Sequence, residues 1–249
     1  PVSEAVAWHR AENLNYDADH ELWLDFTAGG RSAVLDLGCG VGRVALPLAR
    51  ASRQVVGLDS DPDFVAEFNR QAGDGPTRAF VGDALELDDP SGPLGRETFD
   101  RVIAPQNLVQ IVGEGAERLR LFEAIRNRLA PGGRVAITFI EDLPEHSMQI
   151  PPQPEVFEID GWTYSSLSVS LEAEPGAITL HRLRQRIAPD GEVRTSEAET
   201  RFTRVSAVGI EAGLLAAGLG PATFSDMPVS PDYIDSVLAI CSLPASGAE

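Results

Sequence analysis

The sequence predicts an α/β protein: a parallel sheet with helices on both faces, and a small antiparallel sheet inserted late in the chain. Between residues 33 and 140, short apolar runs alternate with longer amphipathic ones, the pattern of successive βα units. Residues 156–204 instead alternate polar and apolar side chains, which is typical of antiparallel strands. The 249 residues, 43% of them hydrophobic, suffice for one sizeable core or one domain carrying an insertion.

Short apolar runs predict the parallel strands, and the amphipathic segments between them predict helices. Strands are expected at 33–37 (AVLDL), 54–58 (QVVGL), 77–81 (TRAFV), 99–104 (FDRVIA) and 134–140 (RVAITFI). Helices are expected near 43–51, 62–72 and 115–130. The last helix should stop at Pro131-Gly132-Gly133. Pro47 conflicts with the first helix, because an interior proline costs a backbone hydrogen bond, so we expect a kink or an irregular first turn there.

The pattern changes after residue 140. Residues 141–155 (EDLPEHSMQIPPQPE) are rich in proline and acid and predict a long loop, which in compact domains is often functional. Residues 156–204 predict three or four antiparallel strands. A helix at 206–218 and strands near 219–225 and 234–243 then resume the α/β pattern. We therefore expect one domain formed by 1–155 and 205–249, interrupted by a sheet at 156–204 that covers a substrate or meets a second subunit.

Composition excludes several classes of function. All basic residues are arginine, so neither a P-loop nor a lysine Schiff base is available. The net charge of -18 and the lack of basic stretches with interleaved aromatics argue against a nucleic-acid partner. Cys39 and Cys241 form neither a disulfide framework nor a metal motif. No apolar run is long enough for a membrane, and the N-terminal residues are charged, so a cytoplasmic location is expected.

The stretch VLDLGCGVGR, residues 34–43, places a glycine-rich turn directly after a buried strand. Such a turn lets backbone approach a ligand closely and aims N–H groups at it. The dinucleotide fingerprint G-x-G-x-x-G requires a third glycine where this sequence has Arg43. The spacing is instead D-x-G-x-G-x-G, and its Asp36 suits a ligand with an ammonium group better than a pyrophosphate.

These motifs resemble those of the class I S-adenosylmethionine-dependent methyltransferases of the small-molecule type. LDLGCGVGR looks like their first motif, VVGLDSD like the second, and FVGDALEL like the third. FDRVIAPQNLVQ and LAPGGRVAI resemble the fourth and following motifs. The resemblance implies a Rossmann-like fold with a seven-stranded mixed sheet, and S-adenosylmethionine as cofactor.

The resemblance also implies which residues bind this cofactor. Gly38, Gly40 and Gly42 would let the backbone pass the methionine part, and Asp36 would interact with its amino group. Asp59 would accept hydrogen bonds from the ribose hydroxyls, and Asp83 one from the adenine amine. Further contacts are expected from the residues beside these positions: Cys39, Ser60, Ala84, Ala104 and Pro105.

Two further cofactor contacts have equally good structural explanations. Arg43 could bind the methionine carboxylate or be a surface helix residue. Tyr16 resembles a tyrosine that closes over the cofactor in small-molecule methyltransferases, yet an aromatic residue before an apolar helix can equally serve packing.

The candidate substrate residues follow the fourth and fifth strands. His146 is the best candidate for a general base among the four histidines, although it could simply be an exposed loop residue. Asn107 and Gln110 could orient a substrate, and Asn107 could equally cap a turn. Glu141, Asp142 and Glu145 favour a cationic substrate or form a solvated acidic loop. No metal site is expected.

The function predicted on these grounds is methyl transfer from S-adenosylmethionine to a nitrogen or oxygen of a small molecule, by in-line displacement. A nicotinamide-dependent oxidoreductase is the alternative enzyme, disfavoured by Arg43. A non-catalytic sensor or scaffold that binds the cofactor is the alternative without chemistry. No membrane partner is expected, and the inserted sheet could mediate a homodimer.

Overall fold

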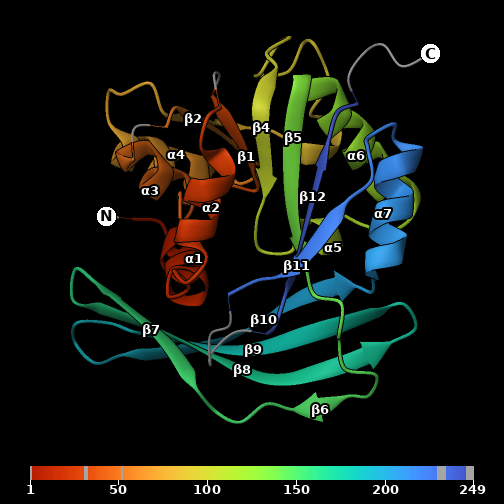
Figure 1. Cartoon of the computed structure of the whole chain (residues 1–249). Helices are drawn as coiled ribbons and strands as arrows, with labels where there is room; N and C mark the ends of the chain where they lie inside the picture. Colours follow the sequence, from red (N-terminus) through yellow and green to blue (C-terminus); the bar gives the residue numbers. More distant parts are fainter. Residues whose placement is uncertain (1, 31–32, 52, 229–233, 245–249) are drawn as a thin grey trace. The chain divides into compact units, whose positions relative to one another are not determined.

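The computed structural model describes residues 2–30, 33–51, 53–228 and 234–244, and the chain divides into two compact units (Figure 1). The first, here called the α/β unit, comprises Ala18–Glu141 and Val205–Glu249. The second, the β-rich unit, comprises Pro1–Asp17 and Asp142–Arg204. None of the described helices is both long and apolar enough to cross a membrane.

A seven-stranded mixed sheet forms the centre of the α/β unit, as predicted. Its strand order is β3-β2-β1-β4-β5-β12-β11. The first five of these strands are parallel, whereas β12 runs antiparallel to β5 and β11 antiparallel to β12. The strands are β1 (Val34–Leu37), β2 (Val55–Asp59), β3 (Arg78–Val81), β4 (Phe99–Ala104), β5 (Leu129–Phe139), β11 (Thr223–Asp226) and β12 (Val237–Ser242).

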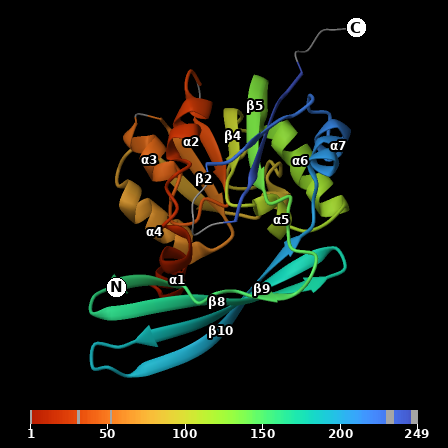
Figure 2. The same cartoon turned by 60° about the horizontal axis from the view of Figure 1, so that its bottom comes forward.

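Helices cover both faces of this sheet (Figure 2). One face carries α2 (His20–Thr27), α3 (Ala45–Arg50) and α4 (Pro62–Ala72), and the other carries α5 (Leu108–Ile111), α6 (Ala116–Arg128) and α7 (Ala207–Ala216). Alternate residues of β1 face the two sides: Leu35 and Leu37 pack with α6 and α7, whereas Val34 packs with α2, α3 and α4. Two apolar cores therefore hold the sheet from opposite sides.

The predicted conflict at Pro47 is resolved by where α3 begins. The helix starts at Ala45, so Pro47 is its third residue, and the first four N–H groups of a helix have no partner within it. Residues 41–44 form turns instead of helix, and the N–H of Leu46 donates to the Gly42 carbonyl. The first turn is therefore irregular, and no kink is needed.

The β-rich unit is an antiparallel sheet with one helix, α1 (Glu4–Asn13). The strand order is β10-β9-β8-β6, with β7 also paired to β8. A short strand lies within the predicted 141–155 loop, at Met148–Gln149. The strands are β6 (Met148–Gln149), β7 (Pro154–Ile159), β8 (Trp162–Glu174), β9 (Ala177–Ile187) and β10 (Val193–Thr203).

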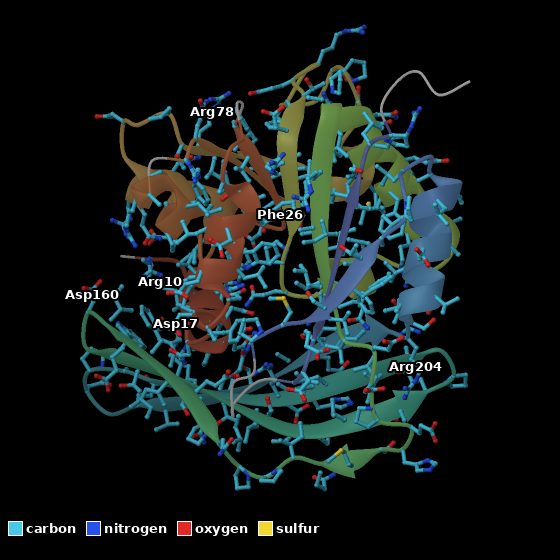
Figure 3. The ribbon with its side chains drawn as sticks, in the orientation of Figure 1. Arg10, Asp17, Phe26, Arg78, Asp160 and Arg204 are labelled. Carbon is cyan, nitrogen blue, oxygen red and sulfur yellow. The ribbon has the colours of Figure 1, made fainter. Side chains whose placement is uncertain are left out.

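The boundaries between the two units along the sequence differ from those predicted. Residues 1–17 and 142–155, expected in the α/β domain, belong to the β-rich unit. The physical reason is the packing of α1 on β7 and β8, where Trp8 meets Tyr164 edge to face with ring centroids 4.9 Å apart. Arg10, labelled in Figure 3, lies over the ring of Phe157.

A tether holds the start of the long loop within the β-rich unit. Arg204, also labelled in Figure 3, donates to the backbone carbonyls of Leu143 and Pro144. Its own N–H donates to the Gly176 carbonyl at 2.7 Å. The predicted loop is thus attached at its beginning to the end of β10.

Candidate functional site

The residues singled out in the α/β unit gather at one edge of its sheet. β1, β2, β3 and β4 are parallel, so their carboxyl ends lie at the same edge, where open α/β sheets bind ligands. The glycine turn follows β1, Asp59 ends β2, Asp83 follows β3, and Ala104 ends β4. The topology therefore brings these predicted positions to one edge.

The glycine turn depends on glycine for two reasons. Gly38, Gly40 and Gly42 have φ values of 65°, 53° and 97°, a region that L side chains rarely adopt. A Cβ on Gly42 would lie 2.6 Å from Leu46 Cγ, and one on Gly38 would lie 3.2 Å from Leu108 Cδ1. The turn is thus packed tightly against α3 and against the first residue of α5.

Backbone hydrogen bonds attach this turn to β2. The N–H groups of Gly38 and Cys39 donate to the Leu58 carbonyl, at 2.8 and 3.2 Å. The N–H of Gly40 donates to Asp59 Oδ2 at 2.8 Å. Asp59 therefore orients the turn, a role that the sequence pattern did not indicate.

The Cys39 side chain points into the sheet. A Cβ on Gly57 would lie 2.6 Å from Cys39 Sγ, so the absence of a side chain at Gly57 makes room for the thiol. Burial raises the pKa of this thiol well above its usual range, and the nearby carboxylates of Asp36 and Asp59 raise it further. The side chain of Cys39 therefore packs inside the protein, and only its backbone would be able to contact a ligand at the turn.

Asp36 is a buried carboxyl group whose oxygens are left without a close hydrogen bond among the described residues. Its side chain is on a residue only 1% exposed, and neither carboxylate oxygen forms a hydrogen bond within the described part of the chain. Burial raises its pKa from 3.8 to about 8; Asp59 and Asp19 add to the rise, whereas Arg43 and the nearby backbone N–H of Ala45 oppose it. Unpaired buried polar groups are costly, so this carboxyl group is suited to a ligand that brings a positive charge.

Arg43 is buried and forms an ion pair, so it is not a surface helix residue. Its Nη1 and Nη2 donate to the two carboxylate oxygens of Asp19, at 2.6 and 2.8 Å. Trp23 Nε1 also donates to Asp19, at 2.7 Å. Asp19 lies in a stretch with no recognisable motif, and only the tertiary structure brings it to Arg43.

Asp59 and Asp83 both use some of their oxygens within the protein. Besides Gly40, Asp59 accepts from the N–H of Asp61 at 3.0 Å, and burial raises its pKa. Asp83 is exposed, and its Oδ1 accepts from the N–H of Leu85 at the start of the short helix η1 (Ala84–Glu86). A carboxylate offers about four acceptor positions, so both retain capacity for a ligand. Ser60 is exposed beside Asp59.

The two predicted substrate residues after β4 have different hydrogen-bonding surroundings. Gln110 is fully buried: its Nε2 donates to the Ile140 carbonyl at 3.0 Å, and its Oε1 accepts from the Ile140 N–H at 2.7 Å. The prediction of a substrate contact for Gln110 is therefore corrected, because both ends of its buried amide bond to the backbone of Ile140, directly after β5. Asn107 begins α5 without capping it, and its Oδ1 is buried with no partner among the described residues.

The remaining candidates are distributed between the units. Glu141 accepts from the N–H of Ala207 at 2.6 Å, so it stabilises the start of α7, as an acid at a helix N-terminus does. Tyr16, half-buried, and His146, exposed, belong to the β-rich unit together with the exposed Asp142 and Glu145. The proposed roles of Tyr16 and His146 stay predictions.

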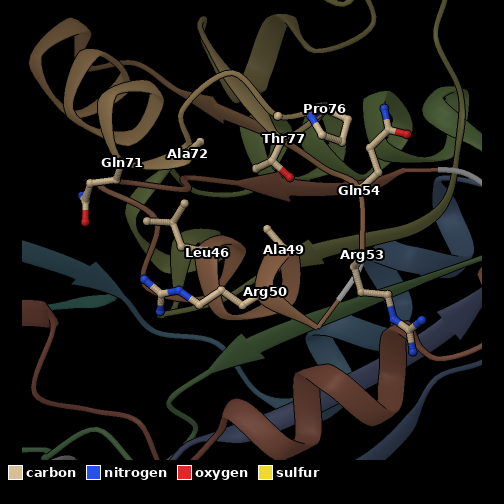
Figure 4. Close-up of a pocket in the computed structure, with 10 residues that line it drawn as sticks. Leu46, Ala49, Arg50, Arg53, Gln54, Gln71, Ala72, Pro76 and Thr77 are labelled. Atoms are coloured by element: carbon tan, nitrogen blue, oxygen red, sulfur yellow. The ribbon is translucent and has the colours of Figure 1, made fainter.

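A separate groove of about 490 Å³ lies at the opposite edge of the α/β sheet (Figure 4). It is lined by residues at the end of α3, the end of α4 and the amino ends of β2 and β3. Arg50 and Arg53 are the cationic side chains in this lining, and their guanidinium groups point away from each other. The groove therefore does not concentrate positive charge on one point.

Residues 34–133 match a family described as a methyltransferase domain. A probable cobalt-precorrin-6B C(15)-methyltransferase from Methanobrevibacter smithii is 27% identical over 107 residues, 43% of this chain and 53% of that protein. A 23S rRNA (uracil(1939)-C(5))-methyltransferase from Yersinia enterocolitica is 37% identical over 83 residues, 32% of this chain and 18% of that protein. This chain thus spans about half or less of the length of these curated relatives.

Two solved structures resemble nearly the whole chain. A sugar N-methyltransferase from Streptoalloteichus aligns with 97% of this chain and 92% of its own, at 20% identity and a TM-score of 0.73. An amino pentose methyltransferase from Micromonospora, solved with S-adenosylmethionine bound, aligns with 98% of each chain, at 21% identity and a TM-score of 0.69. The likeness extends over both units and concerns the fold.

Proposed function

From the class I S-adenosylmethionine-dependent methyltransferase fold of this chain, we propose that it transfers a methyl group from S-adenosylmethionine to a nitrogen or oxygen of a small molecule. The observation that carries the proposal is Asp36, a buried carboxyl group beside a turn that requires glycine; among the described residues, neither of its oxygens has a close hydrogen bond. An enzyme of this class works mainly by alignment, so the site needs precise binding groups more than a reactive side chain.

The residues present fit the cofactor. Asp36 would pair with the α-ammonium group of the methionine part of the cofactor. This group would supply the positively charged partner that the described residues do not give the carboxyl group. The remaining acceptor positions of Asp59 suit two ribose hydroxyls, and those of Asp83 suit an adenine amine. When bound, S-adenosylmethionine would supply the methyl group: a lone pair of the acceptor forms the new bond to carbon while the C–S bond breaks and its electron pair stays on sulfur.

A small-molecule acceptor is the class that the charge of the chain favours. A net charge of -18 repels phosphate backbones, which opposes an RNA or DNA acceptor. The resemblance to structures named for sugar and amino pentose methylation points the same way. In this proposal His146 acts as a general base for a hydroxyl acceptor, Tyr16 covers the cofactor, and the β-rich unit covers the substrate or mediates a dimer.

The test of cofactor binding is calorimetric titration of the whole chain with S-adenosylhomocysteine. Asp36→Asn keeps the shape of the side chain and removes its ability to ionise when a cationic ligand binds, so we expect affinity to fall by about tenfold or more. The matched control is Asp74→Asn, which removes the same charge from an exposed position before β3 and should leave affinity unchanged. Absence of binding by the unmodified protein would overturn the proposal.

The methyl acceptor is identified by a separate assay of turnover. Methyl transfer leaves S-adenosylhomocysteine, and hydrolysis of this product by an added enzyme releases homocysteine, which can be measured. Testing small amines and phenols in this assay would identify the acceptor class. His146→Ala should slow methylation of a hydroxyl acceptor, because a hydroxyl benefits from a base that removes its proton. An unchanged rate for a phenol acceptor would reject His146 as that base.

A further inference from the structure

We infer that the outer side of helices α6 and α7 is a contact surface for a second copy of this chain, and that the two copies pack with these helices antiparallel. The inference is independent of the proposed function and concerns the α/β unit alone. α6 and α7 lie side by side on one face of the sheet, and the residues beneath them belong to one apolar core (Figure 2). Their outer sides are therefore neighbours on the surface of this unit.

The helix α7 is apolar on its exposed side as well as on its buried side. Ile210 and Leu214 are fully buried, whereas Val208 is 78% exposed and Leu215 is 49% exposed. The exposed side consists of five residues without charge: Val208, Gly209, Ala212, Leu215 and Ala216. Helices that are apolar on all sides are normally buried, and exposed apolar patches mark interaction surfaces. The exposed side of α7 is thus suited to be covered by another protein surface.

The large and small residues on this side are arranged symmetrically about Ala212. Val208 and Ala216 lie four residues before and after it, and Gly209 and Leu215 lie three residues before and after it. When a two-fold axis passes Ala212, each residue meets the one on the other side of this centre in the partner helix. Val208 of one copy then meets Ala216 of the other, and Leu215 meets Gly209. Each large side chain fills the space left by a small one, which allows two helices to pack closely.

The exposed side of α6 is self-complementary in charge. Its exposed charged residues are two acids and two arginines, Glu117, Arg120, Glu123 and Arg126, so this side is neutral. Arg120 and Glu123 lie on the same side of the helix, because residues three apart are neighbours on a helix surface. An antiparallel pairing centred midway between them brings Arg120 of each copy to Glu123 of the other. Since the chain carries a net charge of -18, a neutral side with exchangeable opposite charges favours a second copy as the partner.

The centres of these two patterns lie close to the same level, so one two-fold axis serves both helices. A Cβ on Gly213 would lie 2.9 Å from Phe122 Cε2. Further along both helices, a Cβ on Gly218 would lie 3.1 Å from Arg126 Nε. The helices therefore run in the same direction, and the centre of the charge pattern on α6 is near the level of Ala212. The size pattern of α7 and the charge pattern of α6 thus indicate the same antiparallel arrangement.

The first test measures the oligomeric state of the full chain by sedimentation equilibrium over a range of protein concentrations. Ala212→Arg places the same positive charge on both copies at the proposed axis, so we expect the dissociation constant of the dimer to rise by about tenfold or more. Ala66→Arg is the matched control and should leave this constant unchanged, because Ala66 is exposed on α4, on the opposite face of the sheet. An unmodified protein that stays monomeric would overturn the inference. A dimer that Ala212→Arg leaves intact would overturn it as well, and would be the result expected of a dimer formed by the β-rich unit.

The second test exchanges the charges on α6. Arg120→Glu alone, or Glu123→Arg alone, sets like charges against each other across the axis and should weaken the dimer by about fivefold. The double variant Arg120→Glu/Glu123→Arg again sets one cation against one anion, so it should recover the affinity of the unmodified protein. Recovery is specific to pairing between two identical copies. A double variant that dimerises no better than the two single variants would contradict the antiparallel pairing.

A third measurement locates the contact with a small side chain at the axis. Ala212→Cys brings two thiols together at the proposed axis, whereas the native Cys39 and Cys241 are buried. A short bismaleimide should therefore join two chains of Ala212→Cys and should not join chains of the control Ala66→Cys. Equal cross-linking of the two variants, or none in Ala212→Cys at concentrations where the chain is dimeric, would overturn the assignment of the contact to α7.

Discussion

At the scale of single residues, Asp36 links stability to binding. Because burial raises its pKa to about 8, the folded chain holds a proton there that the unfolded chain has released above about pH 4. The folded state then binds more protons than the unfolded state, so the contribution of Asp36 to stability falls as pH rises from about 4 to about 8. This cost is the kind that functional sites retain and a bound cation would offset.

Because the contribution of Asp36 to stability falls as pH rises, replacing Asp36 should change how stability depends on pH. Asp36→Asn removes the titration, so the variant should gain stability relative to the unmodified protein by up to about 1.4 kcal/mol per pH unit between about pH 5 and pH 7. The gain should level off near the folded pKa of about 8. Urea unfolding of both proteins across this range measures the difference. A difference that does not change with pH would show that Asp36 is ionised in the folded chain.

At the scale of elements, the carboxylate of Glu12 adds to the aromatic contacts that hold α1 on the β-rich sheet. Glu12 accepts from Arg184 Nε and Nη2, both at 2.7 Å, and from Ser166 Oγ at 2.7 Å. Burial raises the pKa of Glu12, but these hydrogen bonds and the charge of Arg182 outweigh it, so the net pKa is lowered. The stabilisation is therefore present above the unfolded pKa near 4.5 and is lost as pH falls below it.

The second prediction concerns this docking. Glu12→Gln leaves Arg184 without its charged partner and should cost about 1–3 kcal/mol of unfolding free energy at neutral pH. The cost should shrink in acid, where Glu12 itself becomes neutral. Glu192→Gln is the control, since Glu192 pairs with Arg194 on an exposed turn and should cost under about 1 kcal/mol. Equal costs for the two variants in denaturant unfolding would contradict the docking role of Glu12.

At the scale of the whole molecule, the α/β unit is assembled from two separate segments. β12 and β11, from the last part of the chain, complete the sheet beside β5, while residues 142–204 join residues 1–17 in the β-rich unit. The predicted cofactor contacts lie in the α/β unit except for Tyr16, which lies in the β-rich unit together with the predicted base, His146. The site proposed for the α/β unit can therefore be tested by measuring how much a bound ligand raises the unfolding free energy of the protein.

The third prediction is such a linkage. A ligand at about 100 times its Kd stabilises the folded state by about 2.7 kcal/mol. S-adenosylhomocysteine at that excess should raise the unfolding free energy of the unmodified protein by this amount. At the same ligand concentration Asp36→Asn should gain about 1.4 kcal/mol less if its affinity is tenfold weaker. The same gain in both proteins would mean that Asp36 does not contact the ligand.

Most strands and helices were predictable because their patterns are local. The runs before Leu37, Asp59 and Ala104 read as buried strands, and β1, β2 and β4 are found there. By contrast, the four-residue α5 and the two-residue β6 are too short for periodicity to detect. The domain boundary also escaped prediction, because α1 joins the β-rich unit through contacts with β7 and β8, far along the chain.

The sequence by itself determined the α/β class, the mixed sheet and the glycine turn after β1, because hydrophobic period and glycine spacing are written in adjacent residues. Only the tertiary structure decided what the polar groups do. It showed that Arg43 forms an ion pair with Asp19 and that Gln110 bonds to the backbone of Ile140. Within the described part of the chain, it also left the side-chain oxygens of Asp36 and Asn107 without a close hydrogen bond. Burial and hydrogen bonding depend on residues that are distant in the chain, so no local pattern can state them.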